Sequence, residues 1–488
     1  MNTRGVVGYT YRDFCDYARR FDQVALLTGI ARTALELPDH PSEDPASYLR
    51  TPPWALAAMA RASICHGNRH RSIPVGSDGI PLGCHMYFNI KPQEMSDPAL
   101  SPAFNTWLRI AYEQFPYQER PSAELARVEP FFADYSGRKP LEVLDEAGVT
   151  ALLGAPVRQA VGVAILLHAI AQERGGFFDP AWLNGSDVLD TLPLQDIQTV
   201  MDACFAISFD GFRKLADTAP VLPSLERYTF NPLTARPFLR LDDGRLLAPV
   251  PQLIARRLSP IELYYQGLGR FGLPYARDMG ELLEDYVGRQ LHTLPDADVH
   301  SEIEYGPKKA KTRSIDWIVV FPDAVLLVEV KAARLAAPAR SGADTAQESV
   351  CKTLAEAFGQ IDRTRQAIAD GVPGFASIPT DRPFLGLVAA LDPWYMSNST
   401  ATRALLPQPA VPTVVASLPE LETLVAIGQR LRASEVLQRI TDDPEMRASM
   451  LGSALNRFAE PGDENPILQA AWQRYPFSGP EPAADAPR

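Results

Sequence analysis

The sequence predicts a mixed α+β protein in which a largely α-helical N-terminal region precedes a core of alternating helices and strands. Three observations support this fold class. Apolar residues recur at helical spacing through most of the first 226 residues, and two β-branched runs flank a Pro-Asp pair that begins at Pro322. Helical and strand patterns then alternate to about residue 430. A chain of 488 residues is long enough for two to four domains.

Residues 1–226 are expected to form a helical domain. Apolar residues have helical spacing at 21–37, 53–65, 104–115, 157–173 and 194–207. Because this region contains no catalytic motif, we interpret it as a domain for specificity, partner binding or regulation. A hairpin with an Asp-Gly turn over 236–247 and a helix over 251–268 predict a connector at 227–274.

Two patterns in these regions have the appearance of ligand motifs. The first is a set of five residues within 21 positions: Cys65, His66, His70, Cys84 and His85. Zinc ligands usually occur as two short-spaced pairs, so core cysteines and partly buried histidines are the favoured interpretation. The second is Gly-Leu-Gly-Arg-Phe-Gly at 267–272, which follows a helix rather than a strand and is interpreted as a helix C-cap.

The chain is organised around residues 314–331, which read SIDWIVV, FPDA and VLLVEVK. A hairpin that turns at the Pro-Asp pair joins residues whose numbers sum to 645. Asp316 then lies opposite Glu329, with β-carbons roughly 5 Å apart. Side chains alternate between the faces of a strand, so Glu329 and Lys331 project from the same face. The hairpin therefore gathers two carboxylates and an ammonium group on an apolar sheet.

Burial of these three charged groups is unfavourable unless a cation or a partner compensates them. The sequence therefore predicts a divalent-cation site on the hairpin. The structural alternative is a cross-strand salt bridge among Asp316, Glu329 and Lys331. Such salt bridges are common on solvent-facing sheets, but these strands are apolar on both faces.

The hairpin and its surroundings resemble the PD-(D/E)xK nuclease superfamily, which has the restriction-endonuclease-like fold. Asp316 matches the Asp of the motif, and Glu329-Val330-Lys331 matches its ExK element thirteen positions later. A helix over 280–291 resembles the first helix of the family and carries Glu284 as its glutamate. Gln360 lies in a helix where some branches carry a glutamine. The resemblance covers about a quarter of the chain and implies, over 275–430, an αβββαβ core with a mixed central sheet flanked by helices.

The resemblance also implies a reaction, which is hydrolysis of phosphodiester bonds in DNA with Mg²⁺ or Mn²⁺, leaving a 5′-phosphate and a 3′-hydroxyl. Asp316 and Glu329 would bind the metal ion directly, with the Val330 carbonyl oxygen as a third ligand. Glu284 would hold a metal-bound water or a second ion. Lys331 would either orient the attacking water or stabilise charge that develops on the phosphate. The expected protein is a Mg²⁺-dependent endodeoxyribonuclease in restriction, phage defence or DNA repair.

The net charge of −12 requires any nucleic-acid-binding surface to be local. Lys308, Lys309, Lys311 and Arg313 form a basic cluster that leads into the hairpin, in a chain with only eight lysines. We expect this cluster and Gln360 to contact nucleic acid. A solvated loop is the alternative interpretation of the cluster.

The remaining predictions concern the C-terminus, the compartment and the partners. Residues 431–477 are expected to be helical, and 478–488, rich in Pro and Ala, to be disordered. Five cysteines without a CxxC pair favour the cytoplasm, and the longest apolar run, 160–171, is too short to span a membrane. Two other functions stay open, namely an inactive nucleic-acid-binding module of the same fold and a nuclease that acts on RNA. A homodimer or a defence-system partner protein also stays open.

Overall fold

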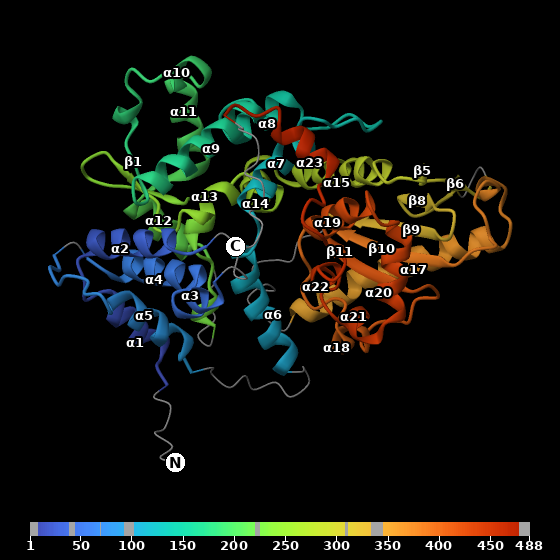
Figure 1. The fold of residues 1–488 in the computed structure, drawn as a ribbon, viewed down its shortest axis with the longest axis horizontal. Helices are drawn as coiled ribbons and strands as arrows, with labels where there is room; N and C mark the ends of the chain where they lie inside the picture. Colours follow the sequence, from blue (N-terminus) through green and yellow to red (C-terminus); the bar gives the residue numbers. More distant parts are fainter. Residues whose placement is uncertain are drawn as a thin grey trace, which may run out of the picture.

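The structure is a computed structural model that describes residues 8–38, 44–68, 70–91, 102–219, 225–307, 311–332 and 345–477. The protein is mixed α+β, as predicted. A β-sheet lies towards each end of an elongated molecule, with helices between the two sheets (Figure 1). The tail expected to be disordered, 478–488, lies outside the described residues.

The first helices pack around a hydrophobic core of their own. This core is lined by α1 (Tyr11–Ala18), α2 (Gln23–Leu35), α4 (Pro53–His66), α5 (Gly79–Phe88) and α12 (Phe209–Asp217). The predicted helices at 21–37 and 53–65 are α2 and α4, and the one at 104–115 is α6 (Pro102–Gln114). A short helix, α3 (Pro45–Arg50), precedes α4.

A small sheet belongs to this N-terminal part. Its strands, in spatial order, are β1 (Phe177–Phe178), β4 (Leu246–Leu247), β3 (Phe238–Arg240) and β2 (Ala206–Ser208). The predicted Asp-Gly hairpin is β3 and β4, and Gly244 in its turn has a φ of 86°. The helix predicted over 194–207 is confirmed except for its last two residues. α11 (Leu194–Val200) and a π-helical turn end at Phe205, because the next three residues pair with β3.

The middle of the chain supplies helices that reach the second half of the molecule. They are α7 (Pro121–Phe132), α8 (Glu146–Leu153), α9 (Val157–Glu173), α13 (Gln252–Arg256) and α14 (Pro260–Phe271). The helix predicted over 251–268 is in fact two helices, because Ser259 caps α14 and proline occupies its first position. Residues 146–173 are apolar enough to span a membrane, but Gly154, with a φ of 92°, divides them into α8 and α9, and both helices line the core.

The second sheet carries the predicted hairpin. Its spatial order is β11–β10–β9–β8–β5, in which β9, β10 and β11 are parallel, while β8 is antiparallel to both β9 and β5. The strands are β5 (Asp298–Ser301), β8 (Trp317–Val320), β9 (Val325–Lys331), β10 (Phe384–Ala390) and β11 (Thr413–Ser417). The strand predicted over 299–305 is interrupted, because β6 (Glu304–Tyr305) pairs with β7 (Thr312–Arg313) in a separate hairpin.

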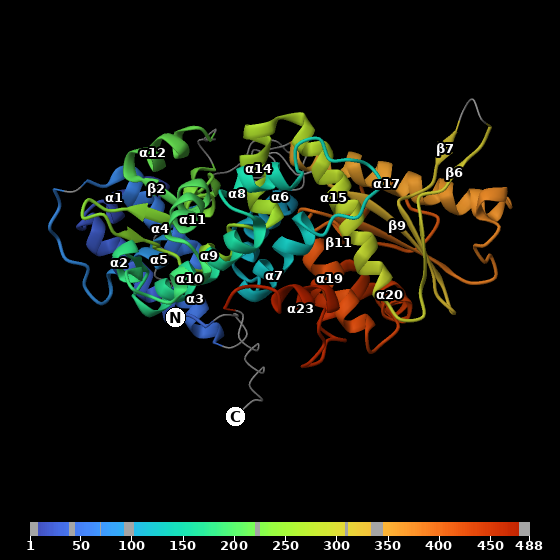
Figure 2. The ribbon, with the colours of Figure 1, turned by 90° about the horizontal axis from the view of Figure 1, so that it is seen from above.

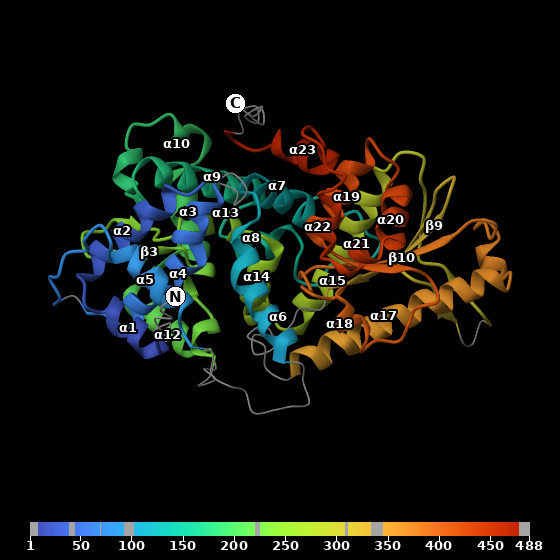
Figure 3. The ribbon, with the colours of Figure 1, turned by 60° about the horizontal axis from the view of Figure 1, so that its bottom comes forward.

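Helices cover both faces of this sheet (Figure 3). One face packs on α15 (Leu273–His292), α19 (Leu418–Gly428) and α20 (Ala433–Asp442), and the other packs on α17 (Thr345–Ala369). Val319 and Leu326 enter the core on the α15 face, whereas their neighbours Ile318 and Leu327 enter the core on the α17 face. The predicted helical segment 431–477 contains α20, α21 (Pro444–Ala448), α22 (Leu451–Leu455) and α23 (Pro466–Trp472).

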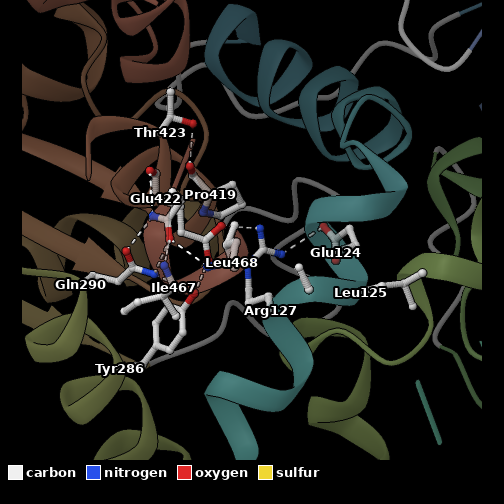
Figure 4. Close-up of polar contacts among 12 residues, drawn as sticks. Glu124, Leu125, Arg127, Tyr286, Gln290, Pro419, Glu422, Thr423, Ile467 and Leu468 are labelled. Atoms are coloured by element: carbon white, nitrogen blue, oxygen red, sulfur yellow. Dashed lines mark hydrogen bonds and ion pairs between the residues drawn. The ribbon is translucent and has the colours of Figure 1, made fainter. Parts of the chain in front are cut away.

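A buried polar network ties α7 to this second half (Figure 4). The Arg127 guanidinium donates to both carboxylate oxygens of Glu422 on α19, each at 2.7 Å. The Tyr286 hydroxyl on α15 donates to the same carboxylate at 2.7 Å and accepts from Gln290. Asn465, which caps α23, donates to Gln290 at 2.7 Å. Helix α7 is therefore fixed to three helices of the C-terminal half by charged and neutral hydrogen bonds.

The first ligand-like pattern is only partly helical. Cys65 and His66 end α4, and Cys84 and His85 lie in α5, whereas His70 lies between these helices. Cys84 is buried in the N-terminal core, as predicted, but the prediction of partly buried histidines is wrong, because His66, His70 and His85 are exposed. All five cysteines are free. The glycine pattern covers the end of α14, and its last residue, Gly272, is the C-cap at a φ of 68°, as predicted.

Candidate active site

The predicted hairpin register is confirmed. Trp317 pairs with Val328, and the three following pairs of β8 and β9 also have residue numbers that sum to 645. Asp316 lies one position beyond the last pair, where its Oδ2 accepts a hydrogen bond from the Val330 amide at 2.6 Å. The site therefore lies at the open end of the hairpin, away from its turn. Glu329 has the same parity as Val325 and Leu327, which enter the core on the α17 face.

Lys331 connects two of the predicted site residues. Its Nζ donates to Glu329 Oε1 at 2.6 Å and to Gln360 Oε1 on α17 at 2.9 Å. The Glu329 side chain is only 3% exposed, and the structure gives its Oε2 no hydrogen-bond partner among the described residues. A buried carboxylate oxygen without a donor is destabilising, and a bound cation would relieve this cost.

Glu284 approaches the same place from the other side of the sheet, on α15. The Trp317 indole Nε1 donates to the Glu284 main-chain oxygen at 3.1 Å, so the residue after Asp316 holds this turn of α15 against β8. On the other face, the Ile315 amide donates to Thr364 Oγ1 of α17 at 3.0 Å. The residues on both sides of Asp316 are thus anchored to different helices.

The carboxyl groups of the candidate site are buried and close to one another, and both effects raise their pKa values. Burial, and then the negative charge of Glu329, raise the pKa of Asp316 to about 7. Burial, and then the charge of Asp316, raise the pKa of Glu284 to about 7. Burial also raises the pKa of Glu329, although the Lys331 ammonium opposes this shift. A single lysine does not compensate these carboxylates.

Glu302 is a fourth carboxylate of this site, and the sequence analysis missed it. The register of β5 and β8 pairs Ser301 with Trp317, so one further position places Glu302 opposite Asp316. Its charge contributes to the raised pKa values of Asp316, Glu329 and Glu284. Extended in the same way, the two registers align Glu302, Asp316 and Glu329 in one row across β5, β8 and β9.

These carboxylates suit a hard divalent cation, because Mg²⁺ and Mn²⁺ prefer oxygen ligands. In the described parts of the chain, no three Asp, Glu, His or Cys side chains are already gathered as ligands of one ion. Asp316 Oδ2 and Glu329 Oε1 are held instead by the Val330 amide and the Lys331 ammonium group. Glu329 Oε2, which has no donor among the described residues, could bind a metal ion while these hydrogen bonds are kept.

The predicted basic cluster is described only in part. Lys311 and Arg313 lie on the β6–β7 hairpin, which projects from the sheet (Figure 2). Lys311 pairs with Glu304 at 2.6 Å, and Arg313 pairs with Glu302 at 3.3 Å, so Arg313 is directly beside the carboxylate row. The two remaining members, Lys308 and Lys309, lie outside the described residues.

Comparisons with protein-family models, with curated proteins and with solved structures found no match to this chain. The assignment of a function therefore depends on the site itself.

Proposed function

We propose that this protein is a Mg²⁺-dependent endodeoxyribonuclease. The observation that carries the proposal is the carboxylate row of Glu302, Asp316 and Glu329 beside Lys331, with a buried Glu329 oxygen that has no donor among the described residues. Apart from the separate β6–β7 hairpin, which lies between β5 and β8, the chain order α15, β5, β8, β9, α17, β10 and the parallel pairing of β9 with β10 also support it. Both agree with the restriction-endonuclease-like core expected from the sequence.

The metal ion would be held by Asp316 and Glu329, with the Val330 carbonyl oxygen and Glu284 as further donors. When bound, Mg²⁺ supplies positive charge to the scissile phosphate and lowers the pKa of a coordinated water. Lys331 would orient the attacking water or stabilise the negative charge that develops on phosphate oxygens. Its hydrogen bond to Gln360 restricts the ammonium group to the edge of the carboxylate row.

A salt bridge from Lys331 alone accounts for less of this arrangement of charges than a metal site does. Lys331 contacts only one oxygen of Glu329, whereas Asp316, Glu302 and Glu284 add three more carboxylates to the same region. An excess of like charge around partly buried strands is destabilising unless a cation is bound. We therefore propose catalysis in preference to an inactive binding module.

Incubation of the purified protein with closed circular plasmid tests the activity, because a circle without ends is cut only by an endonuclease. Cleavage should require Mg²⁺ or Mn²⁺ and stop in EDTA. Linear duplex, single-stranded DNA and RNA in parallel reactions test DNA specificity against the RNA alternative. Products carrying 5′-phosphates are expected.

The variant Asp316→Asn should lose nearly all cleavage and, in EDTA, unfold at a temperature no lower than that of the unaltered protein. Asp298→Asn is the matched control, because Asp298 lies on the neighbouring strand β5 but its side chain is 76% exposed. Metal-independent cleavage, or full activity of the Asp316 variant, would refute the proposal. Binding to DNA without any cleavage would favour the inactive module. A confirmed activity would fit a cytoplasmic protein of restriction, phage defence or DNA repair, acting alone, as a homodimer or with a defence-system partner.

A further inference from the structure

The loop between α7 and α8, residues 133–145, crosses helix α15 close to the candidate active site (Figure 2). We call it the α7–α8 loop. It comes from the N-terminal region, about 150 residues before Glu284, and no sequence motif marks it. Two adjacent cations, Arg138 and Lys139, lie exposed on this loop.

Hydrogen bonds fix the α7–α8 loop along α15. The Asp278 carboxylate is buried and accepts three main-chain N–H donors of the loop, from Glu142, Val143 and Leu144, at 2.7 to 3.0 Å. Arg277 forms a two-pronged ion pair with Glu142 at 2.7 and 2.8 Å. Hydrogen bonds to a buried carboxylate are among the stronger ones in proteins, so this end of the loop is held in one position.

The other end of the loop is anchored next to the site residue Glu284. The Ser136 hydroxyl donates to Asp285 at 2.8 Å, and Lys139 Nζ donates to Glu281 at 2.6 Å. Glu281 lies three positions before Glu284, so both carboxylates are on the same side of α15. The hydrogen bond to Glu281 raises the pKa of Lys139, and the nearby positive charge of Arg313 on the β6–β7 hairpin opposes this shift.

Lys139 is available to another anion. Its side chain is 58% exposed, and exposed ion pairs contribute only about 0 to 1 kcal/mol. A phosphate group can therefore compete with Glu281 for the ammonium group. Cations beside this acidic site would attract a polyanion that the carboxylates alone would repel.

We propose that the α7–α8 loop is part of the substrate-binding surface, and that Arg138 and Lys139 bind the phosphodiester backbone of a DNA strand together with Arg313. This inference rests on the proposed function. It gives the N-terminal region a direct part in substrate binding, through a loop fixed to the helix that carries Glu284.

The test compares DNA binding by Arg138→Gln/Lys139→Gln with binding by its parent, both in the full-length chain with Asp316→Asn to prevent cleavage. Fluorescence anisotropy with a labelled DNA duplex is measured over a range of salt concentrations. The slope of log Kd against log salt should fall by about 1 for each phosphate contact that is lost. In the active chain, the same pair of substitutions should raise KM several-fold and change kcat less.

Two further variants separate phosphate binding from structural and general charge effects. Arg12→Gln/Arg20→Gln removes the same charge from exposed positions around α1, at the far end of the molecule (Figure 1), and should leave the slope unchanged. Glu281→Gln removes the Lys139 ion pair but keeps the cation, so it should bind DNA at least as tightly as the parent. Weaker binding by Glu281→Gln would mean that Lys139 only fixes the loop, and would overturn the inference.

The outcomes also separate this inference from the proposed function. An unchanged slope in Arg138→Gln/Lys139→Gln, with DNA bound and cleaved by the unaltered protein, would overturn only the inference. No binding and no cleavage by the unaltered protein would overturn both. A lower slope with RNA but not with DNA would support the loop as a nucleic-acid contact and overturn the choice of DNA.

Discussion

Trp317 and Glu284 are joined by a hydrogen bond of 3.1 Å from the indole N–H to the main-chain oxygen, across the contact between β8 and α15. The Trp317 ring also lies against Gly288, one helical turn further along α15, where an added β-carbon would be 2.1 Å from the ring. This close packing sets the distance between the helix that carries Glu284 and the strand that follows Asp316. The contact between Trp317 and Glu284 therefore links the two parts of the candidate metal site, which are α15 and the β8–β9 hairpin.

Gly288→Ala is therefore expected to push α15 away from β8 and to lower cleavage by tenfold or more, with a loss of stability of about 1 to 3 kcal/mol. Gly280→Ala is the control on the same helix, because its β-carbon would meet nothing within 4 Å. That control should keep its activity and gain up to about 1 kcal/mol of stability. Cleavage rates and urea unfolding of both variants provide the measurement. Equal activity of the two variants would show that the Trp317 contact does not position Glu284.

Glu302→Gln tests the carboxylate row. If Glu302 takes part in holding metal, the Mg²⁺ concentration for half-maximal cleavage should rise by about tenfold, since ligand charge sets the affinity of such sites. Glu304→Gln, two residues away and paired with Lys311 on the projecting hairpin, should change it little. A Mg²⁺ titration of each variant decides the matter. The same shift in both variants would point to a general charge effect.

Asp316→Asn should show a pH-dependent effect on stability in EDTA. Because burial and Glu329 raise the pKa of Asp316 to about 7 in the folded state, the folded protein retains this proton at pH values where the unfolded chain has lost it. This group therefore destabilises the fold progressively as pH rises from about 4 to about 7. The stability advantage of the variant over the unaltered protein should grow by about 1 to 3 kcal/mol across that window and then level off.

Denaturant unfolding at several pH values measures this difference. Added Mg²⁺ should stabilise only the unaltered protein, because it binds the folded state with Asp316 ionised. A constant difference between the two proteins across the window would mean that Asp316 is not in the crowded environment described above.

The buried ion pair between α7 and α19 should be strongly coupled. Arg127→Met leaves the Glu422 carboxylate buried without its cation and should cost about 3 to 5 kcal/mol of stability. Arg127→Met/Glu422→Gln should recover part of this loss, because the amide can still accept from Tyr286 without carrying a charge, while Glu124, which pairs with Arg127 at 3.4 Å, still loses its cation. Urea denaturation of the single and double variants measures the coupling. Additive effects would show that the two side chains act independently.

The hairpin register was predictable because its determinants are local. A Pro-Asp turn and two apolar runs fix which residues pair, and the observed pairs follow that pattern. Glu302 was missed because no turn or motif in the sequence fixes the pairing of 298–301 with 317–320, which are separated by the β6–β7 hairpin. Its carboxylate became recognisable only when the β5–β8 register was known.

Other parts of the site depend on contacts between distant segments. Lys139 reaches α15 from a loop 142 residues earlier in the chain, and Thr364 meets Ile315 across 49 residues. No periodicity or motif in the sequence predicts either contact, because it is the packing of helices against the sheet that brings these residues together. The resemblance to the nuclease superfamily identified Gln360 as a site residue, but it did not predict the hydrogen bond from Lys331 to Gln360.

The salt bridge between Arg127 and Glu422 limits how early the protein can fold while it is being synthesised. The two residues are 295 positions apart, so synthesis at 5 to 20 residues per second separates them by about 15 to 60 s. During that interval, α7 has left the ribosome without the anion that it needs in the core. The two strands that complete the sheet, β10 and β11, also arrive late. A growing chain therefore cannot assemble the candidate catalytic half until residues 384–428, which form β10, β11 and α19, have been synthesised, and the proposed nuclease activity would arise only after that point.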